Sequence, residues 1–298
     1  MVYPIPLSSE TLQLASRRGV RAALSALGVR SSRRLGQHFL VEPAALVRIL
    51  EAADLKPGDA VLEVGPGLGV LTGELLRRAG RVVAVEIDRR LCAWLRERFG
   101  HLPHFTLVED DILKVAPGLL MGPSPYLVVA NLPYAITSAA LRHLLEAEPR
   151  PRRLVVMVQW EVARRIAAAP PEMSLLALAV QYYARPEVVA RVPAGAFFPV
   201  PQVDSAVVHL EVFPQPRLPL LPEVFFRLAH AAFAHPRQQI GKTLAAGLGR
   251  PREEVVAALE AAGVDPRRRP ETLALEEWAA IGTAWTGISR DSQERAGR

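Results

Sequence analysis

Ala60-Val-Leu-Glu-Val-Gly-Pro-Gly-Leu-Gly69 is the stretch that decides the fold class of this chain of 298 residues. Its first five residues form a short apolar run typical of a buried strand, and residues 70–78 have helical spacing. A strand, a glycine turn and a helix in this order indicate nucleotide binding, because glycines let a ligand approach the backbone at a helix N-terminus. The spacing G-x-G-x-G differs from the dinucleotide fingerprint, so it favours a ligand without a pyrophosphate.

Acidic residues follow the next two predicted strands. Residues 81–86 form an apolar strand that ends in Glu86, about 20 residues beyond the first glycine, where a carboxylate can accept both hydroxyls of a ribose. Residues 105–108 form another strand, which ends in Glu109-Asp110-Asp111. One carboxylate of this turn can accept a hydrogen bond from the amine of an adenine. These acids predict that the ligand is a nucleoside.

The next apolar run, residues 126–130, ends in Asn131-Leu132-Pro133-Tyr134, which predicts the catalytic site. Pro133 has no N–H and biases Leu132 towards an extended backbone, so the Leu132 carbonyl has a defined direction. This carbonyl and the Asn131 side-chain oxygen can each accept one hydrogen of an exocyclic amine, while Tyr134 can stack on the base. A strand that ends in a plain Asn-Pro turn is the alternative. Together with the glycines and acids upstream, the motif predicts a methyltransferase that uses S-adenosylmethionine.

At these residues the chain resembles the KsgA/RsmA family of ribosomal RNA adenine dimethyltransferases. The motifs that carry the resemblance stand in the family's order: LGQHFL at 35–40, EVGPGLG at 63–69, NLPY at 131–134, MVQWEV at 157–162, FPVPQVDSA at 198–206 and a tail at 263–278. The resemblance covers residues 30–282. It implies a Rossmann-like class I S-adenosylmethionine-dependent methyltransferase that transfers methyl groups to N6 of two adjacent adenosines. In this family they lie in the 3′-terminal hairpin of small-subunit ribosomal RNA.

The resemblance also implies a set of cofactor contacts. They fall on His38, Leu40, Gly65, Glu86, Asp111 and Asn131, and the glycine turn adds Gly67. His38 departs from the commoner Asn, but an imidazole still offers one donor and one acceptor. Ala135 and Trp160 stand where many members carry Asn and Lys, which leaves details of RNA contact open.

The segment 193–201 is rich in Pro and Gly and is predicted to be an irregular loop. Exposed aromatic residues on such a loop suit stacking on an extruded base. We expect Phe198 to face Tyr134 across the adenine and Phe197 to pack in the core; packing of both in the core is the alternative. Phe198 thus joins Asn131, Leu132, Pro133 and Tyr134 in the predicted catalytic set. No strong general base is required, because positioning and orientation supply much of the rate.

Alternating strands and helices predict an α/β fold with a doubly wound, mostly parallel sheet, with ligand at the carboxyl ends of its first strands. The expected strands are 60–64, 81–86, 105–108, 126–130, 154–159 and a pair near 178–190 and 204–213. The segment 214–219 indicates a linker, and helices are expected at 222–234, 238–247, 252–262 and 271–284, which form a small all-α domain. The predicted domains are an N-terminal helical extension over 1–30, a methyltransferase domain over 31–213 and a helical RNA-binding domain over 214–298.

The composition is that of a globular protein with an anionic partner. Half of the residues are apolar and the net charge is +6, which favours nucleic acid. Cys92 is the only cysteine, so neither an intramolecular disulfide nor a cysteine-based metal cluster is expected, and no histidine spacing predicts a metal site. Neither a signal peptide nor a transmembrane run is recognised. We expect a cytoplasmic monomer that acts on small-subunit ribosomal RNA or on the immature small ribosomal subunit.

The N-terminal segment 7–29 is predicted to be one amphipathic helix with Arg17, Arg18 and Arg21, leading into the basic stretch 30–34. Such residues can hold phosphates; a solvated helix end is the alternative.

Three other functions share part of this pattern. A resistance-type methyltransferase that acts on one adenosine of large-subunit RNA has the same motifs, but the tail at 263–278 argues against it. A DNA adenine methyltransferase shares the Asn-Pro-Tyr chemistry, but no separate target-recognition domain is evident. A non-catalytic ribosome assembly or RNA-binding factor would not need Glu86, Asp111, Asn131 and Tyr134, and all four are present.

Overall fold

The computed structural model describes residues 6–29, 31–32 and 36–296, with side chains in the last helix described up to Thr286. Most of the basic stretch at 30–34 lies outside these residues, as does Leu35. The chain forms two compact units: the first comprises Met1–Ala163 with Arg185–Pro214, and the second Arg164–Ala184 with Gln215–Arg298. Residues 164–184, which the sequence assigned to the methyltransferase domain, thus cluster with the C-terminal helices.

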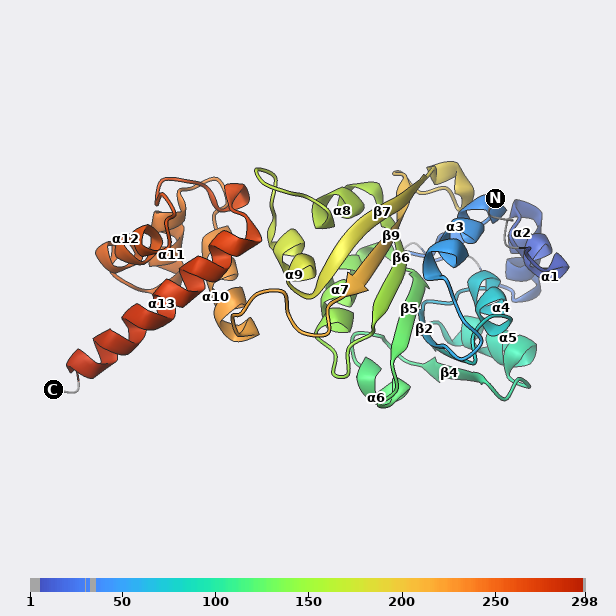
Figure 1. The fold of residues 1–298 in the computed structure, drawn as a ribbon. Coiled ribbons are helices and arrows are strands. Elements are labelled where there is room, and N and C mark those ends of the chain that lie inside the picture. The colour runs from blue at the N-terminus through green and yellow to red at the C-terminus, as the bar shows by residue number, and fades with distance from the viewer. Residues whose placement is uncertain (1–5, 30, 33–35, 297–298) are drawn as a thin grey trace, which may run out of the picture. The chain divides into compact units, whose positions relative to one another are not determined.

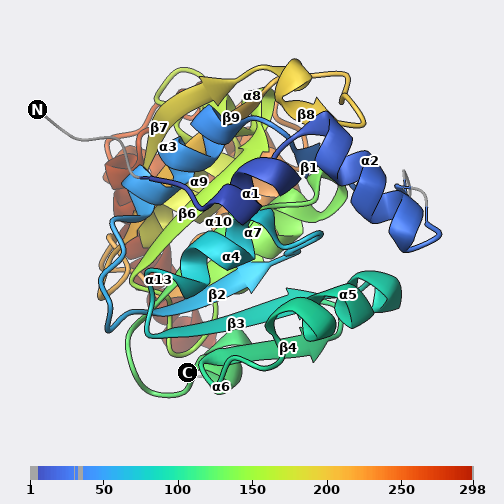
Figure 2. The ribbon, with the colours of Figure 1, turned by 90° about the vertical axis from the view of Figure 1, so that its right-hand side faces the viewer.

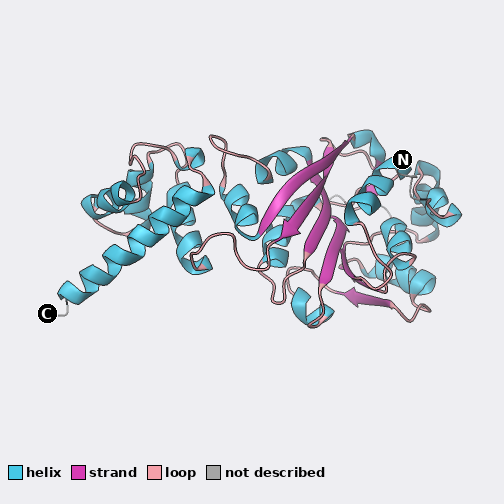
Figure 3. Ribbon diagram, viewed as in Figure 1, coloured by secondary structure: helices cyan, strands magenta, loops and turns pink. Residues whose placement is uncertain are grey.

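The first unit is built on a seven-stranded sheet in the order β4-β3-β2-β5-β6-β9-β7 (Figures 1 and 3). The strands are β2 (Ala60–Val64), β3 (Arg81–Glu86), β4 (Phe105–Glu109), β5 (Tyr126–Asn131), β6 (Arg153–Gln159), β7 (Ala184–Val192) and β9 (Ser205–Val212). Strands β2 to β6 pair in parallel, and β9 runs antiparallel to β6. The predicted mostly parallel sheet is therefore confirmed.

Helices cover this sheet, as Figure 2 shows, and its central strands are buried. The helices are α3 (Pro43–Ala53), α4 (Val70–Leu76), α5 (Arg89–Phe99), α6 (Pro117–Met121) and α7 (Thr137–Leu145). Strand β2 pairs with β3 on one side and with β5 on the other. The strand order therefore reverses at β2, and this switch point is where an open α/β sheet leaves a crevice for ligand.

The N-terminal segment forms two helices rather than the one predicted, α1 (Ser9–Leu14) and α2 (Arg17–Ala26). The side chain of Ser8 accepts a hydrogen bond from the Thr11 N–H, and the side chain of Ser16 accepts one from the Gly19 N–H. Ser16 thus starts a new helix where the pattern of apolar residues continues, because an N-cap serine satisfies N–H groups that a helix leaves open.

The predicted strand at 178–190 was wrong in its first part. Residues Leu175–Tyr183 form helix α9, and strand β7 begins only at Ala184. The Ser174 side chain caps the helix by accepting from the Ala177 N–H at 3.1 Å. Short apolar runs do not distinguish a buried helix from a strand by periodicity, so the serine cap was the available signal.

The segment 193–201 is more regular than expected. It contains a 3-10 turn η2 (Ala194–Ala196) and a short strand β8 (Phe197–Phe198), which pairs antiparallel with β1 (Phe39–Leu40). The Val41 N–H extends this pairing with a 2.8 Å bond to the Ala196 carbonyl. Pairing with a distant strand, which the local sequence does not reveal, therefore orders this segment.

The second unit consists of helices around an aromatic core. Besides α9 they are α10 (Pro222–Phe233), α11 (Ile240–Leu248), α12 (Arg252–Ala261), η3 (Pro270–Thr272) and α13 (Leu275–Ala296), while α8 (Trp160–Ile166) leads into this unit. The fully buried ring of Tyr182 stacks on Phe225 at 4.5 Å between centroids. Trp278 is also fully buried, against Phe233. None of the helices that the structure describes is long and apolar enough to cross a membrane.

Candidate active site

A cavity of about 190 Å³ opens at the carboxyl ends of β2, β3, β4 and β5. This is many times the roughly 10–15 Å³ that one water needs. The predicted residues that line it are His38, Leu40, Gly65, Gly67, Glu86, Asp111, Asn131, Leu132, Pro133 and Tyr134. Segments from four strand ends and from the stretch before β1 thus meet at one place.

The glycine turn after β2 forms one wall of the cavity. Gly65 has φ 66° and Gly67 has φ 60°, in the left-handed region that side-chain-bearing residues rarely adopt. A Cβ on Gly67 would also lie 3.3 Å from the Phe39 ring. The conformation and close packing of this turn therefore require glycine at both positions, which line the cavity.

Glu86 lies at the end of β3 and is 6% exposed. Its Oε2 accepts the Gly67 N–H at 3.1 Å, and its Oε1 accepts the N–H groups of Ile87 and Asp88, both at 3.0 Å. Burial raises the pKa of the Glu86 carboxyl, and these three N–H groups counteract part of that rise. A carboxylate has about four lone-pair sites and three of them are taken, so Oε2 of the well-oriented Glu86 can still accept from a ligand.

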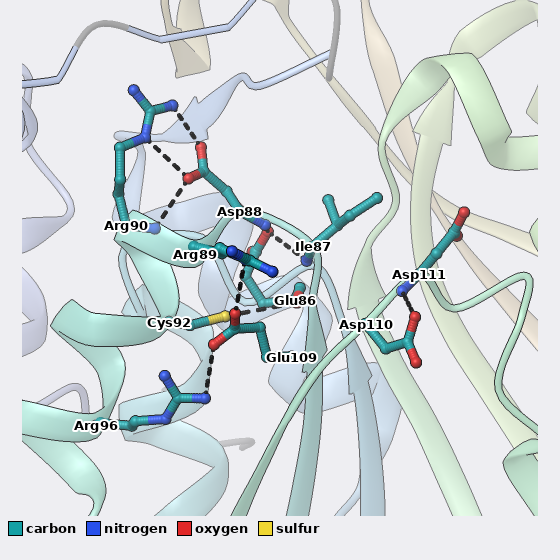
Figure 4. Close-up of polar contacts among 10 residues, drawn as sticks. All are labelled: Glu86, Ile87, Asp88, Arg89, Arg90, Cys92, Arg96, Glu109, Asp110 and Asp111. Atoms are coloured by element: carbon teal, nitrogen blue, oxygen red, sulfur yellow. Dashed lines mark hydrogen bonds and ion pairs between the residues drawn. The ribbon is translucent and has the colours of Figure 1, made fainter.

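The acidic turn after β4 divides into an outer and an inner part (Figure 4). Glu109 forms ion pairs with Arg89 at 3.2 Å and Arg96 at 2.8 Å and does not line the cavity. Asp110 and Asp111 do line it. Asp110 Oδ1 accepts the Asp111 N–H at 2.7 Å. Of the three carboxylates that could accept a hydrogen bond from an adenine amine, Glu109 is therefore excluded by its position.

Asn131 and Leu132 present two acceptors at the end of β5. The Asn131 Nδ2 donates to the His38 carbonyl at 3.2 Å, which leaves Oδ1 as the acceptor of this amide. The Leu132 N–H donates to the Met157 carbonyl at 3.1 Å and so continues the pairing of β5 with β6. Among the described residues, no group donates to the Leu132 carbonyl. This pair matches the two hydrogens of an exocyclic amine.

Tyr134 is held on two sides. Its hydroxyl lies 2.5 Å from the Ser205 Oγ, and its ring stacks on the His38 imidazole with centroids 5.4 Å apart. Burial raises the pKa of the Tyr134 hydroxyl. His38 Nδ1 lies 2.8 Å from the Pro199 carbonyl; since a carbonyl only accepts, Nδ1 carries a proton. His38 therefore links the aromatic platform to the segment that carries Phe198.

Phe198 differs from the other predicted residues because it does not line the cavity. The Arg21 guanidinium lies over its ring, 5.0 Å from the centroid. Phe197 is fully buried, so the expectation that it packs in the core is confirmed. Stacking of Phe198 opposite Tyr134 across a bound adenine stays a prediction.

Glu63 is a cavity residue that sequence reasoning missed. It is 1% exposed, and its Oε2 has no hydrogen-bond partner among the described residues. Burial raises the pKa of this carboxyl to about 8. The signal was present in the sequence, because a single acid interrupts the apolar run of β2. Ile87 and Ile112, which also line the cavity, had no such signal.

The raised pKa of Glu63 predicts a pH-dependent stability. The folded state holds the proton up to about pH 8, whereas the reference value is 4.5, so stability falls as the pH rises between these values. Since one pKa unit corresponds to about 1.4 kcal/mol, this group should lower the free energy of unfolding by on the order of 4 kcal/mol between pH 5 and pH 9. Glu63→Gln should remove this contribution.

Urea unfolding at both pH values measures the effect. The control is Glu109→Gln, which alters a carboxyl outside the cavity. Equal pH dependence of Glu63→Gln and the wild type would contradict the prediction.

Proteins of known family resemble this chain over most of its length. The model of a family described as ribosomal RNA adenine dimethylase matches residues 28–283. A Dehalococcoides mccartyi protein named ribosomal RNA small subunit methyltransferase A is 48% identical, over 87% of this chain and 89% of its own length. A protein of the same name from Moorella thermoacetica is 46% identical over 83% of this chain and 89% of its own length.

Two solved structures share the fold. The crystal structure of the 23S rRNA methyltransferase ErmE is 33% identical with a TM-score of 0.65, covering 83% of this chain and 98% of that one. A dimethyladenosine transferase from Plasmodium falciparum is 23% identical with a TM-score of 0.73, covering 85% of this chain and 98% of its own. The predicted class I methyltransferase fold is thereby confirmed.

Proposed function

Because the chain belongs to the ribosomal RNA adenine dimethylase family, we propose that it methylates N6 of two adjacent adenosines in the 3′-terminal hairpin of small-subunit ribosomal RNA. The methyl donor is S-adenosylmethionine. The observation that carries the proposal is the pair of acceptors, Asn131 Oδ1 and the Leu132 carbonyl, beside a cavity whose walls suit a nucleoside. The product would be N6,N6-dimethyladenosine, formed during ribosome assembly.

The cavity residues fit this donor. Glu86 would accept the ribose hydroxyls, and the inner carboxylate Asp111 would accept the adenine amine. The bare backbone at Gly65 and Gly67 would let the donor approach the glycine turn. His38 and Leu40 would complete the wall between this turn and Asn131. When bound, S-adenosylmethionine supplies an electrophilic methyl group on a positively charged sulfur, which is a good leaving group.

The residues of the chain then have to orient a weak nucleophile. The lone pair of adenine N6 is delocalised into the ring, so the amine attacks poorly. Asn131 and Leu132 accept its two hydrogens and favour a more tetrahedral nitrogen with a directed lone pair. Tyr134, held by Ser205 and His38, supports the face of the base. Positioning therefore replaces a general base, and the proton can leave to solvent after transfer.

The choice of the small subunit rests on the names of the relatives at 46–48% identity. The similarity to ErmE, which acts on 23S rRNA, favours large-subunit RNA as a second candidate. A monomeric state and a cytoplasmic location stay predictions.

Transfer of radiolabelled methyl groups to undermethylated small subunits, followed by mass mapping of the digested RNA, tests the proposal. We expect dimethyladenosine at two adjacent positions of the 3′-terminal hairpin. Label that enters only large-subunit RNA would favour the second candidate. Cofactor binding without transfer to either RNA would make the protein a binding factor with a methyltransferase fold.

A further inference from the structure

Helix α2 presents a row of arginines beside the active-site segment. Its ten residues, Arg17–Ala26, bury Val20, Ala23 and Leu24. Arg17, Arg18 and Arg21 are exposed. The helix precedes residues 28–283, which the family model matches. These three arginines, here called the α2 arginine face, are therefore a feature that the family match leaves out.

Two contacts fix the α2 arginine face to the segment that carries Phe198. The Arg17 Nη2 donates to the Gly195 carbonyl at 2.9 Å, and the Arg21 guanidinium lies over the Phe198 ring at 5.0 Å. Figure 2 shows α2 next to the β1–β8 pair. Strand β8 pairs with β1, and Pro199 contacts His38, which lines the cavity, so the arginine face is connected to the candidate active site through this segment.

The preceding helix anchors α2 to the sheet domain. The Ser8 N–H donates to Oε1 of the buried Glu74 on α4 at 2.8 Å, and Glu10 forms an ion pair with Arg98 on α5. These contacts hold α1, which leads directly into α2. The arginine face is thus part of a docked element and not of a loose tail.

The positive charges of the face have no acidic partner within the described part of the chain. Some arginines elsewhere on the surface do: Arg48 pairs with Glu51, Arg142 with Glu146 and Arg152 with Asp59. Other exposed arginines, such as Arg77 and Arg237, also form no ion pair with a described residue, so the place beside Phe198 is what distinguishes the face. Arg17 and Arg18 also occupy the first turn of α2, where the helix dipole disfavours cations. Uncompensated charges in an unfavourable position are expected where an anionic partner binds.

We propose that the α2 arginine face binds backbone phosphates of the RNA strand that flanks the target adenosine. This inference rests on the proposed function, since it assigns further contacts to the same RNA substrate. Arg21 connects the two sites, because it lies over the ring on which the extruded base is predicted to stack. Phosphate contacts set register and orientation without reading sequence. The face therefore holds the strand so that the target base reaches Asn131.

The test measures binding of the 3′-terminal hairpin RNA to the full chain by filter binding at several KCl concentrations. The variant Arg17→Gln/Arg18→Gln/Arg21→Gln removes the face. We expect its affinity to fall at least about tenfold near physiological salt, and the slope of log K against log [KCl] to become shallower by about 2 to 3. The affinity for S-adenosylmethionine and the thermal unfolding midpoint should stay at their wild-type values.

A matched control carries Arg48→Gln, Arg142→Gln and Arg152→Gln, which change the net charge by the same amount at arginines that have acidic partners. Its salt slope should remain that of the wild type. An equal loss of RNA affinity in both triple variants would show that the effect comes from net charge alone, which would overturn the inference. An unchanged salt slope in the first variant would overturn it as well. If that variant is unstable, Arg18→Gln replaces it, because the Arg18 side chain makes no polar contact with described residues; its slope should change by about 0.7 to 0.9.

Methyl transfer separates this inference from the proposed function. At saturating RNA the first variant should transfer methyl groups at close to the wild-type rate, with a raised KM for RNA. Failure of the wild type to methylate any RNA would refute the proposed function. If the wild type binds and methylates the RNA and the variant has the same KM for RNA, only the role of α2 is refuted.

Discussion

Asn131→Ala is expected to lower the rate of methyl transfer by on the order of 10²- to 10³-fold, the loss seen when one preorganised group that stabilises a transition state is removed. The Asn131 Nδ2 donates to the His38 carbonyl at 3.2 Å, which leaves Oδ1 as the acceptor that we propose for the adenine amine. Alanine removes this acceptor and leaves the Leu132 carbonyl to orient the nitrogen by itself. The amine would then keep its planar, unreactive geometry for most of the time.

Single-turnover transfer from radiolabelled S-adenosylmethionine, with cofactor and RNA both saturating, measures this rate. Asn131→Asp serves as the matched control, because its carboxylate keeps an acceptor but cannot donate to the His38 carbonyl. We expect Asp to retain more activity than Ala. A rate for Asn131→Ala within tenfold of the wild type would show that the amide does not orient the nucleophile.

Glu86→Gln is expected to weaken the binding of S-adenosylmethionine by about 10- to 100-fold, which corresponds to the loss of charged hydrogen bonds. The two carboxylate oxygens accept three backbone N–H groups, including that of Gly67 in the glycine turn. An amide has only one oxygen, so its NH₂ group must face either Gly67 or the N–H groups of Ile87 and Asp88. The substitution removes an acceptor for the ribose and loosens the turn that forms the cavity wall.

Isothermal titration of the cofactor measures this effect without any RNA. Glu109→Gln is the matched control: it lies on the neighbouring strand, pairs with Arg89 and Arg96, and does not line the cavity. Its affinity should remain within about twofold of the wild type. If both substitutions weakened cofactor binding equally, the loss would come from the changed charge of the region and not from a lost contact with the ligand.

The alternation of strands and helices, the glycine turn and the polar residues at the strand ends could all be predicted from the sequence. In a parallel sheet the residues after each strand share one edge, so the order of motifs predicts that Glu86, Asp111 and Asn131 converge. Local patterns suffice here, because apolar runs and turn residues act over a few positions. The same local rules failed at α9, where a buried helix and a buried strand have the same apolar composition.

The contacts that complete the site join residues far apart in the chain. The Asn131–His38 bond spans 93 positions, and the Tyr134–Ser205 bond spans 71. The pairing of β1 with β8 and the position of Arg21 over Phe198 are equally remote from any local pattern. The burial that raises the pKa of Glu63 is likewise a property of the packed interior and not of its neighbours in sequence.

The amino-acid sequence by itself therefore determined the fold class, the edge of the sheet at which the site lies and ten of the residues that line it. Tertiary structure decided that the Asn131 amide donates to the His38 carbonyl and keeps Oδ1 as an acceptor, which acids line the cavity, and which arginines have no acidic partner among the described residues. Periodicity and turn chemistry depend on neighbouring residues, whereas orientation and protonation depend on every group that packing brings within a few ångströms.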